Sequence, residues 1–159
     1  MTSRSDSTPI PFADISITMP SAPFVLTNGK IQPTTPQNTI DATLGFETAY
    51  PSFFQGSTGQ LVVVTPPKHY TGPVQLNYLL NDPKYQILGL AFEPVGAGQV
   101  GQREFRTVAL NRTEISSVMT VTDTLTPADA NVTFTYGILV QEVATGYIGL
   151  IDPQIHDQP

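Results

Sequence analysis

The chain has 159 residues, of which 40% are hydrophobic and 13% are charged. A chain of this length suits one domain that buries roughly 70% of its unfolded surface, and its apolar content is too high for a disordered protein. The formal charge of −6 argues against a nucleic-acid partner, because phosphate binding needs clustered Lys and Arg. Fifteen prolines exclude long helices over most of the chain, since a proline inside a helix costs about 3 kcal/mol.

The absence of cysteine excludes a disulfide, a thiolate metal site and a cysteine nucleophile. Residues 1–11 lack the apolar core of a secretory signal peptide, so we expect a flexible tail there and a single β-domain over 12–159. A cytoplasmic location is favoured for the same reason, although the sequence leaves localisation open. The longest apolar runs are far shorter than the roughly 20 residues of a membrane helix, so no membrane partner is expected.

Alternating apolar and polar residues predict strands from the start of the domain. Residues 13–19 place Ile15, Ile17 and Met19 on one face, and Asn28-Gly29 predicts a tight hairpin because both residues tolerate positive φ. Further strands are expected at 39–44, 60–65, 74–80, 85–92, 103–110 and 115–122. The strand at 85–92 is apolar on both faces, which is typical of a strand in the centre of a sheet.

The clearest strand covers residues 131–141, where five apolar side chains recur at period two: Val132, Phe134, Tyr136, Ile138 and Val140. Residues 144–146 predict a turn and 147–151 a returning strand, after which 152–155 is expected to leave the sheet. About nine or ten strands at regular spacing predict an all-β protein, specifically a two-sheet antiparallel β-sandwich of immunoglobulin-like type.

Three short motifs resemble the DP-EP family of small bacterial proteins. They are Asp152-Pro153-Gln154-Ile155 near the end, Glu93-Pro94 after an apolar strand, and the strand at 136–140. The resemblance covers the chain from about Gly72 onward, and more sequence precedes that region than the family pattern has. It implies a compact immunoglobulin-like β-sandwich, and it carries over no functional residue because no activity is established for the family.

Two patterns associated with catalysis or cofactors occur without their usual context. Residues 96–101 match the G-x-G-x-x-G dinucleotide fingerprint, but no helix or βαβ unit is predicted around them, so a plain connection is favoured. His69 and His156 are the only histidines, and each lies beside turn residues without a partner at metal-ligand spacing. We expect exposed loop histidines, no catalytic residue, no cofactor and no metal site.

Loop residues give two further candidates for binding. Asp82, Asp123 and Asp129 are the most plausible calcium oxygens, yet they lack the spacing of a calcium loop, and turn or cap roles are favoured. The aromatic loop with Tyr50, Phe53 and Phe54 can either contact a sugar or protein partner or plug an open end of the core. Plugging is favoured, since monomers rarely expose large apolar patches.

We therefore expect a non-enzymatic interaction or structural module that associates with itself. Sheet edges need partners, the chain offers few Lys residues to protect them, and a two-fold homodimer is the commonest symmetric solution. The alternative is a carbohydrate- or calcium-dependent ligand-binding module that uses the aromatic loop, with a glycan or another protein as partner. An enzyme is the least favoured class, because no nucleophile, base or metal can be named.

Overall fold

A computed structural model of the chain describes residues 8–24, 26–27, 30–31, 39–94, 107–125, 133–152 and 154–157. Every regular element in this part of the chain is a β-strand, and none of it forms a helix long and apolar enough to cross a bilayer. The strands are β1 (Phe12–Thr18), β2 (Leu26–Thr27), β3 (Lys30–Ile31), β4 (Thr43–Glu47), β5 (Leu61–Val64), β6 (Val74–Leu80), β7 (Tyr85–Pro94), β8 (Thr107–Arg112), β9 (Ser117–Asp123), β10 (Thr133–Glu142), β11 (Ile148–Ile151) and β12 (Gln154–Asp157).

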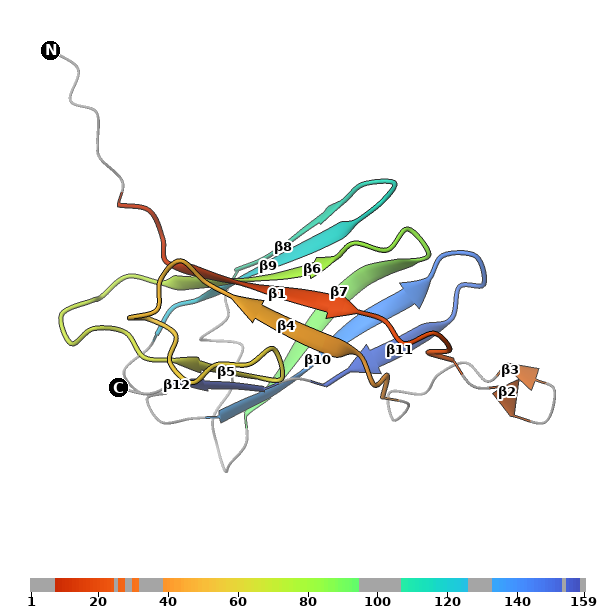
Figure 1. The fold of residues 1–159 in the computed structure, drawn as a ribbon, viewed down its shortest axis with the longest axis horizontal. Coiled ribbons are helices and arrows are strands. Elements are labelled where there is room, and N and C mark those ends of the chain that lie inside the picture. Colours follow the sequence, from red (N-terminus) through yellow and green to blue (C-terminus); the bar gives the residue numbers. More distant parts are fainter. Residues whose placement is uncertain are drawn as a thin grey trace, which may run out of the picture.

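The first large sheet has the order β4-β1-β6-β9-β8 (Figure 1). Its inner strands follow the sequence alternation closely, since every second residue of β6 and β9 is buried. Ala13, Ile15 and Ile17 point inward from β1, as the period-two pattern predicts. β1 runs parallel to β6, while the other three pairs are antiparallel.

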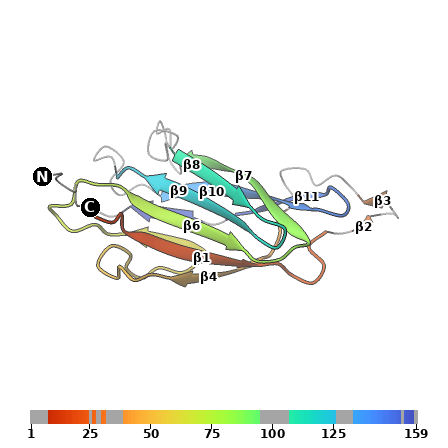
Figure 2. The same ribbon diagram turned by 90° about the horizontal axis from the view of Figure 1, so that it is seen from above.

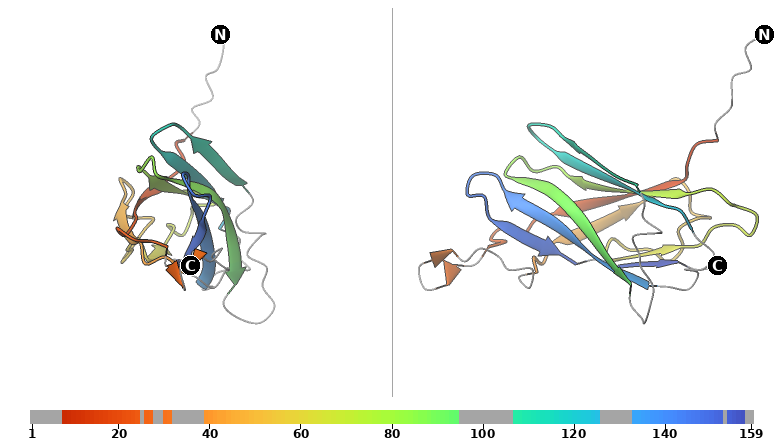
Figure 3. Two further views of the ribbon diagram at one scale, coloured as in Figure 1. Left: turned by 90° about the vertical axis from the view of Figure 1, so that its right-hand side faces the viewer. Right: turned by 180° about the vertical axis from the view of Figure 1, so that it is seen from behind.

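The second large sheet is built around β10, which pairs antiparallel with three other strands. β7 pairs with β10 along one side, and β11 and β12 share its other side. β12 then pairs with β5 in the parallel direction. The turned views show the two sheets as separate layers, with the small β2–β3 hairpin at one end of the molecule (Figures 2 and 3).

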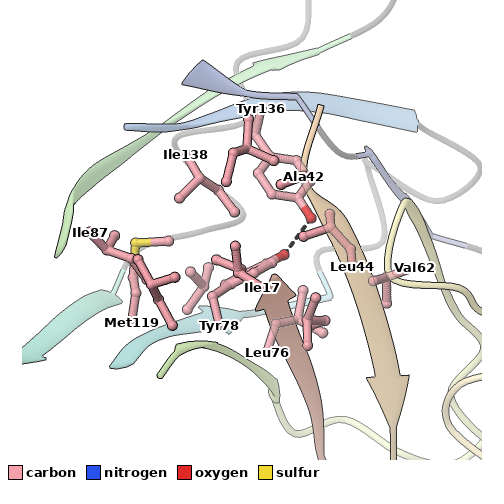
Figure 4. Packing of buried hydrophobic residues seen from close by; sticks show 14 of the residues in the cluster. Ile17, Ala42, Leu44, Val62, Leu76, Tyr78, Ile87, Met119, Tyr136 and Ile138 are labelled. Carbon is pink, nitrogen blue, oxygen red and sulfur yellow. Dashed lines mark hydrogen bonds between the residues drawn. The ribbon is translucent and has the colours of Figure 1, made fainter. Parts of the chain in front are cut away.

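One hydrophobic core joins the two sheets, and Figure 4 shows its centre. Leu76 and Met119 from the first sheet and Ile87 and Ile138 from the second are fully buried. Tyr78 and Tyr136 meet between the sheets, with their hydroxyl oxygens 2.5 Å apart and their rings edge to face. One hydroxyl donates to the other, so each buried oxygen has a hydrogen-bond partner.

Several predicted strands are confirmed and three expectations are wrong. The predicted strand at 74–80 coincides with β6, and the two-residue strands β2 and β3 pair as the Asn28-Gly29 hairpin predicts, although that dipeptide lies outside the described residues. The chain does not leave the sheet after Asp152, because β12 pairs with both β10 and β5. The sheets are also not purely antiparallel, since β1–β6 and β5–β12 are parallel.

The third correction concerns β7, which was expected in the centre of a sheet. Among the described residues it has one strand partner, β10, and it extends to Pro94. Ile87 is buried in the core, and side chains from the β8–β9 hairpin cover the outer edge of the strand at that residue.

Candidate functional site

The outer strands of the sheets carry backbone groups that need partners, and the contacts at each edge differ. At the β4 edge, the Gln60 side chain donates to the Ala42 carbonyl at 3.3 Å, and Gly59 packs against the Leu44 backbone. At the β11 edge, the Ile40 amide donates to the Leu150 carbonyl at 2.6 Å. Loop residues therefore contact the outer side of both strands at these positions.

The edge of β5 is covered in the same way by the loop that precedes it. The Ser57 hydroxyl accepts from the Val63 amide and donates to the Val63 carbonyl, both at 3.0 Å. Phe54 forms an isolated antiparallel bridge with Val64. This edge is closed by a segment of the same chain.

At Ile87, the outer edge of β7 is covered by side chains of the opposite sheet. The Arg112 guanidinium donates to the Ile87 carbonyl through Nε at 3.0 Å and Nη2 at 2.8 Å. The Ile87 amide donates to the Ser117 hydroxyl at 3.0 Å. Both outward-facing backbone groups of Ile87 are thus satisfied, which closes the open side of the second sheet at this point.

The outer edge of β8 has no partner among the described residues. β8 pairs with β9 on one side, and Figure 1 shows the β8–β9 hairpin at the margin of the molecule. Val108 and Leu110 lie opposite the fully buried Val121 and Met119, so they point to the same inner face. Yet Val108 is 45% exposed and Leu110 is 37% exposed, because the second sheet does not extend over them.

The ladder between β8 and β9 determines which backbone groups of β8 point outward. The Thr113 amide donates to the Ser116 carbonyl at 2.8 Å, which makes this the hydrogen-bonded pair next to the turn. Bonded and non-bonded pairs alternate along an antiparallel ladder. The N–H and C=O groups of Val108, Leu110 and Arg112 therefore face away from β9. We call these groups, with the exposed Val108 and Leu110 side chains, the open β8 edge.

The aromatic loop is divided between the core and the surface. Phe54 is 4% exposed and belongs to the core, whereas Tyr50 and Phe53 are half-buried against it. The Phe53 ring lies 4.8 Å from Tyr70, and the Tyr50 ring lies 5.4 Å from Phe12, both in edge-to-face contact. This packing favours the plugging interpretation for Phe54, while parts of Tyr50 and Phe53 stay accessible.

The structure does not bring the two histidines into a common described site. His69 is exposed in a turn after β5, in keeping with the loop position expected for it. His156 lies within β12, opposite Thr133 of β10, so its predicted loop position is wrong. The G-x-G-x-x-G segment at 96–101 lies outside the described residues.

Two of the three candidate calcium ligands, Asp82 and Asp123, have structural roles in turns. Asp82 accepts from the Lys84 amide at 3.0 Å in the turn before β7. Asp123 is fully buried and accepts from the Leu125 amide at 2.9 Å, where Leu125 takes a positive φ of 54°. Asp129 lies outside the described residues, and in the part that the structure covers no three His, Asp or Glu side chains gather to hold a metal ion.

Sequence reasoning anticipated that an edge needs a partner, but it did not identify β8. The available signal is weak: residues 107–112 hold three consecutive apolar residues, Val108, Ala109 and Leu110, and neither Lys nor Pro. Which edges are covered depends on loop contacts between residues that are distant in the chain. No model of a protein family matches the sequence, and no curated protein shows significant similarity to it.

Proposed function

We propose that the chain is a non-enzymatic interaction module that pairs with a second copy of itself through the open β8 edge. The observation that carries this proposal is the contrast between edges. Loop residues or side chains contact the outer edges of β4, β5, β7 and β11 at the positions given above, whereas the outer edge of β8 has no partner within the described part of the chain and lies beside exposed apolar side chains. An exposed strand of this kind is a template for pairing with another chain.

The β8 edge lacks the devices that normally prevent such pairing. Thr107–Arg112 contains no Lys, no Pro and no acidic residue. Its single charged group is the Arg112 guanidinium, which is bound to the Ile87 carbonyl and so does not guard the edge. Two copies of a chain with net charge −6 can therefore approach here without carboxylates facing each other.

Two-fold symmetry defines how β8 of one copy meets β8 of the other. An axis perpendicular to the sheet keeps the inner faces on one side and pairs the strands antiparallel. With Ala109 on the axis, Val108 of each copy lies opposite Leu110 of the other, and the outward N–H and C=O groups of both residues bond across the interface. Apolar side chains then face apolar side chains, and the two first sheets become one continuous sheet.

A single-cysteine experiment tests this register, because the natural chain has no thiol. In Ala109→Cys the two Cα atoms lie about 4.5 Å apart across the axis, within the range of a disulfide. In the control Asn111→Cys, also exposed on β8, they lie about 14 Å apart at ~3.4 Å per residue. We expect Ala109→Cys to form a disulfide-linked dimer under mild oxidation and Asn111→Cys to remain monomeric.

Native mass spectra over a range of concentrations complete the test. The unmodified chain should give a concentration-dependent dimer, and Leu110→Lys should abolish it while leaving the thermal unfolding transition in place, since Leu110 is exposed. Equal cross-linking of the two cysteine variants contradicts the register. A monomer at every concentration, with no Ala109→Cys disulfide, contradicts self-association itself.

We also propose that the two sheets form an immunoglobulin-like β-sandwich of the kind the DP-EP resemblance implies. The shared core and the two five-stranded sheets support it. The carbohydrate- or calcium-binding alternative has less support, because Phe54 is in the core and the candidate calcium ligands Asp82 and Asp123 bond to turn amides. Its test is Phe53→Ala alone, since Phe54→Ala would report on stability rather than binding.

A further inference from the structure

A cleft lies at the Glu142 end of β10, between the segment that follows β1 and the β10–β11 hairpin. It has a volume of about 190 Å³. Phe24 forms one wall, Tyr85 at the start of β7 forms another, and the hairpin supplies Glu142, Thr145 and Tyr147. These five residues come from three distant parts of the chain. The cleft is separate from the open β8 edge and does not depend on dimerisation.

Aromatic rings surround one side of this cleft. The Phe24 ring centroid lies 6.5 Å from Tyr85 and 5.9 Å from Tyr147, with the ring planes tilted by 41° and 55°. Phe24 and Tyr147 are half-buried, and Tyr85 is 8% exposed. A cation held over Phe24 can lie within about 6 Å of a neighbouring ring, which is the range of a cation–π contact.

A carboxylate completes the cleft on the hairpin side. Glu142 is half-buried, and its Oε2 accepts a hydrogen bond from the Thr145 hydroxyl, which orients the carboxylate. None of the described residues that line the cleft is Lys or Arg. Burial, followed by the negative charges of Glu142 and Asp82, raises the pKa of Tyr85, in keeping with a negative local potential. An anionic ligand is thereby disfavoured.

We propose that this cleft binds a small organic cation, specifically an alkylated ammonium group, between the aromatic rings and the Glu142 carboxylate. The aromatic walls favour methyl-bearing ammonium groups over hydrated metal ions, which need six or more oxygens in the case of calcium. One carboxylate neutralises the single positive charge. The net charge of −6 raises the concentration of cations near the protein.

Choline is the probe, and 3,3-dimethyl-1-butanol is its neutral isostere with the same shape. Each is titrated into ¹⁵N-labelled protein, and amide shifts are followed by NMR. We expect choline to shift amides of residues 142–147 and 85 in a saturable manner, with the isostere at least five-fold weaker. Equal shifts by both compounds, or choline shifts confined to other regions, would overturn the proposal.

Two variants and a matched control locate the binding. Glu142→Gln keeps the acceptor for Thr145 but removes the charge, and it should weaken choline binding up to about five-fold at low salt. Tyr147→Leu should weaken binding roughly two- to five-fold, the value of one cation–π contact at an accessible site. Glu47→Gln removes the same charge from an exposed position on β4 and should leave the affinity unchanged. An equal loss in Glu47→Gln and Glu142→Gln would mean that net charge alone attracts the probe, which would also overturn the proposal.

Discussion

Replacing Tyr136 by phenylalanine removes the partner of a fully buried hydroxyl in the centre of the core. Tyr78 is completely inaccessible, and its hydroxyl is 2.5 Å from that of Tyr136 (Figure 4). A buried donor left without its partner costs about 1–3 kcal/mol, whereas replacing both partners by apolar groups of the same shape can be nearly neutral. Tyr136→Phe should therefore lower the free energy of unfolding by about 1–3 kcal/mol.

A double-mutant cycle separates this hydrogen bond from the packing of the rings. The edge-to-face contact of the two rings, 5.8 Å between centroids, is retained in all phenylalanine variants. The double variant of Tyr78→Phe and Tyr136→Phe should then lose less stability than the sum of the two single variants, by about 1 kcal/mol or more. Urea unfolding at one fixed protein concentration gives each value, which keeps any dimer contribution constant.

Additivity of the two substitutions within about 0.5 kcal/mol would refute this reasoning. It would mean that each hydroxyl finds another partner when its neighbour is removed. A change in the slope of the unfolding curve would instead indicate an altered denatured or native state, and the cycle would have to be repeated by calorimetry.

The same tyrosines predict how stability depends on pH. Burial raises the pKa of Tyr78 and of Tyr136 above the ordinary 10.0, so the folded state retains protons that the unfolded state loses. Their contribution should be complete below about pH 10 and decline above it, which urea unfolding at increasing pH measures; a flat profile between pH 10 and 12 would contradict it. In the loop beside β4, a Cβ at Gly59 would clash with the Leu44 carbonyl group, so Gly59→Ala should lower the unfolding free energy by roughly 1–3 kcal/mol. Gly89→Ala is the control, because nothing lies within 4 Å of its added Cβ, and an equal loss in both variants would show that the close approach is not the cause.

Local alternation was sufficient to predict the strands that form the core. In β1, β6 and β10, each apolar residue at period two points inward, so the pattern and the burial agree over whole strands. The short hairpin was predictable for a similar reason, since two adjacent residues determine its turn. Interactions of this kind depend on neighbours in the sequence, which a single sequence displays directly.

Pairing between distant segments could not be predicted from the same signals. Nothing in the sequence near Ile155 indicates that it lies beside Val62, a partner more than ninety positions earlier. Likewise, the apolar run in β7 has the composition of a central strand, yet Arg112 and Ser117 cover its edge in place of another strand. Local composition indicates that a strand is buried, but it does not indicate which groups bond to the edge of that strand.

The candidate sites illustrate the same limit at the level of side chains. The open β8 edge is defined by contacts that four other edges make and β8 does not make among the described residues. The cleft joins Phe24, Tyr85 and Tyr147, which share no motif or spacing along the chain. The aromatic loop, by contrast, was conspicuous in the sequence because its rings are adjacent, and most of their area is used for packing.

The position of β12 has a consequence for the order in which the protein folds. β12 lies between β10 and β5, so β5 can join the second sheet only after the segment Gln154–Asp157 is in place. The chain between β5 and β12 must lose conformational entropy before the contacts between these strands can form. Such non-local pairing slows folding. During synthesis on the ribosome, Leu61–Val64 therefore cannot pair with β12 until Gln154–Asp157 has emerged. Before that, the Phe54 backbone and the Ser57 hydroxyl can already bond to the backbone of β5.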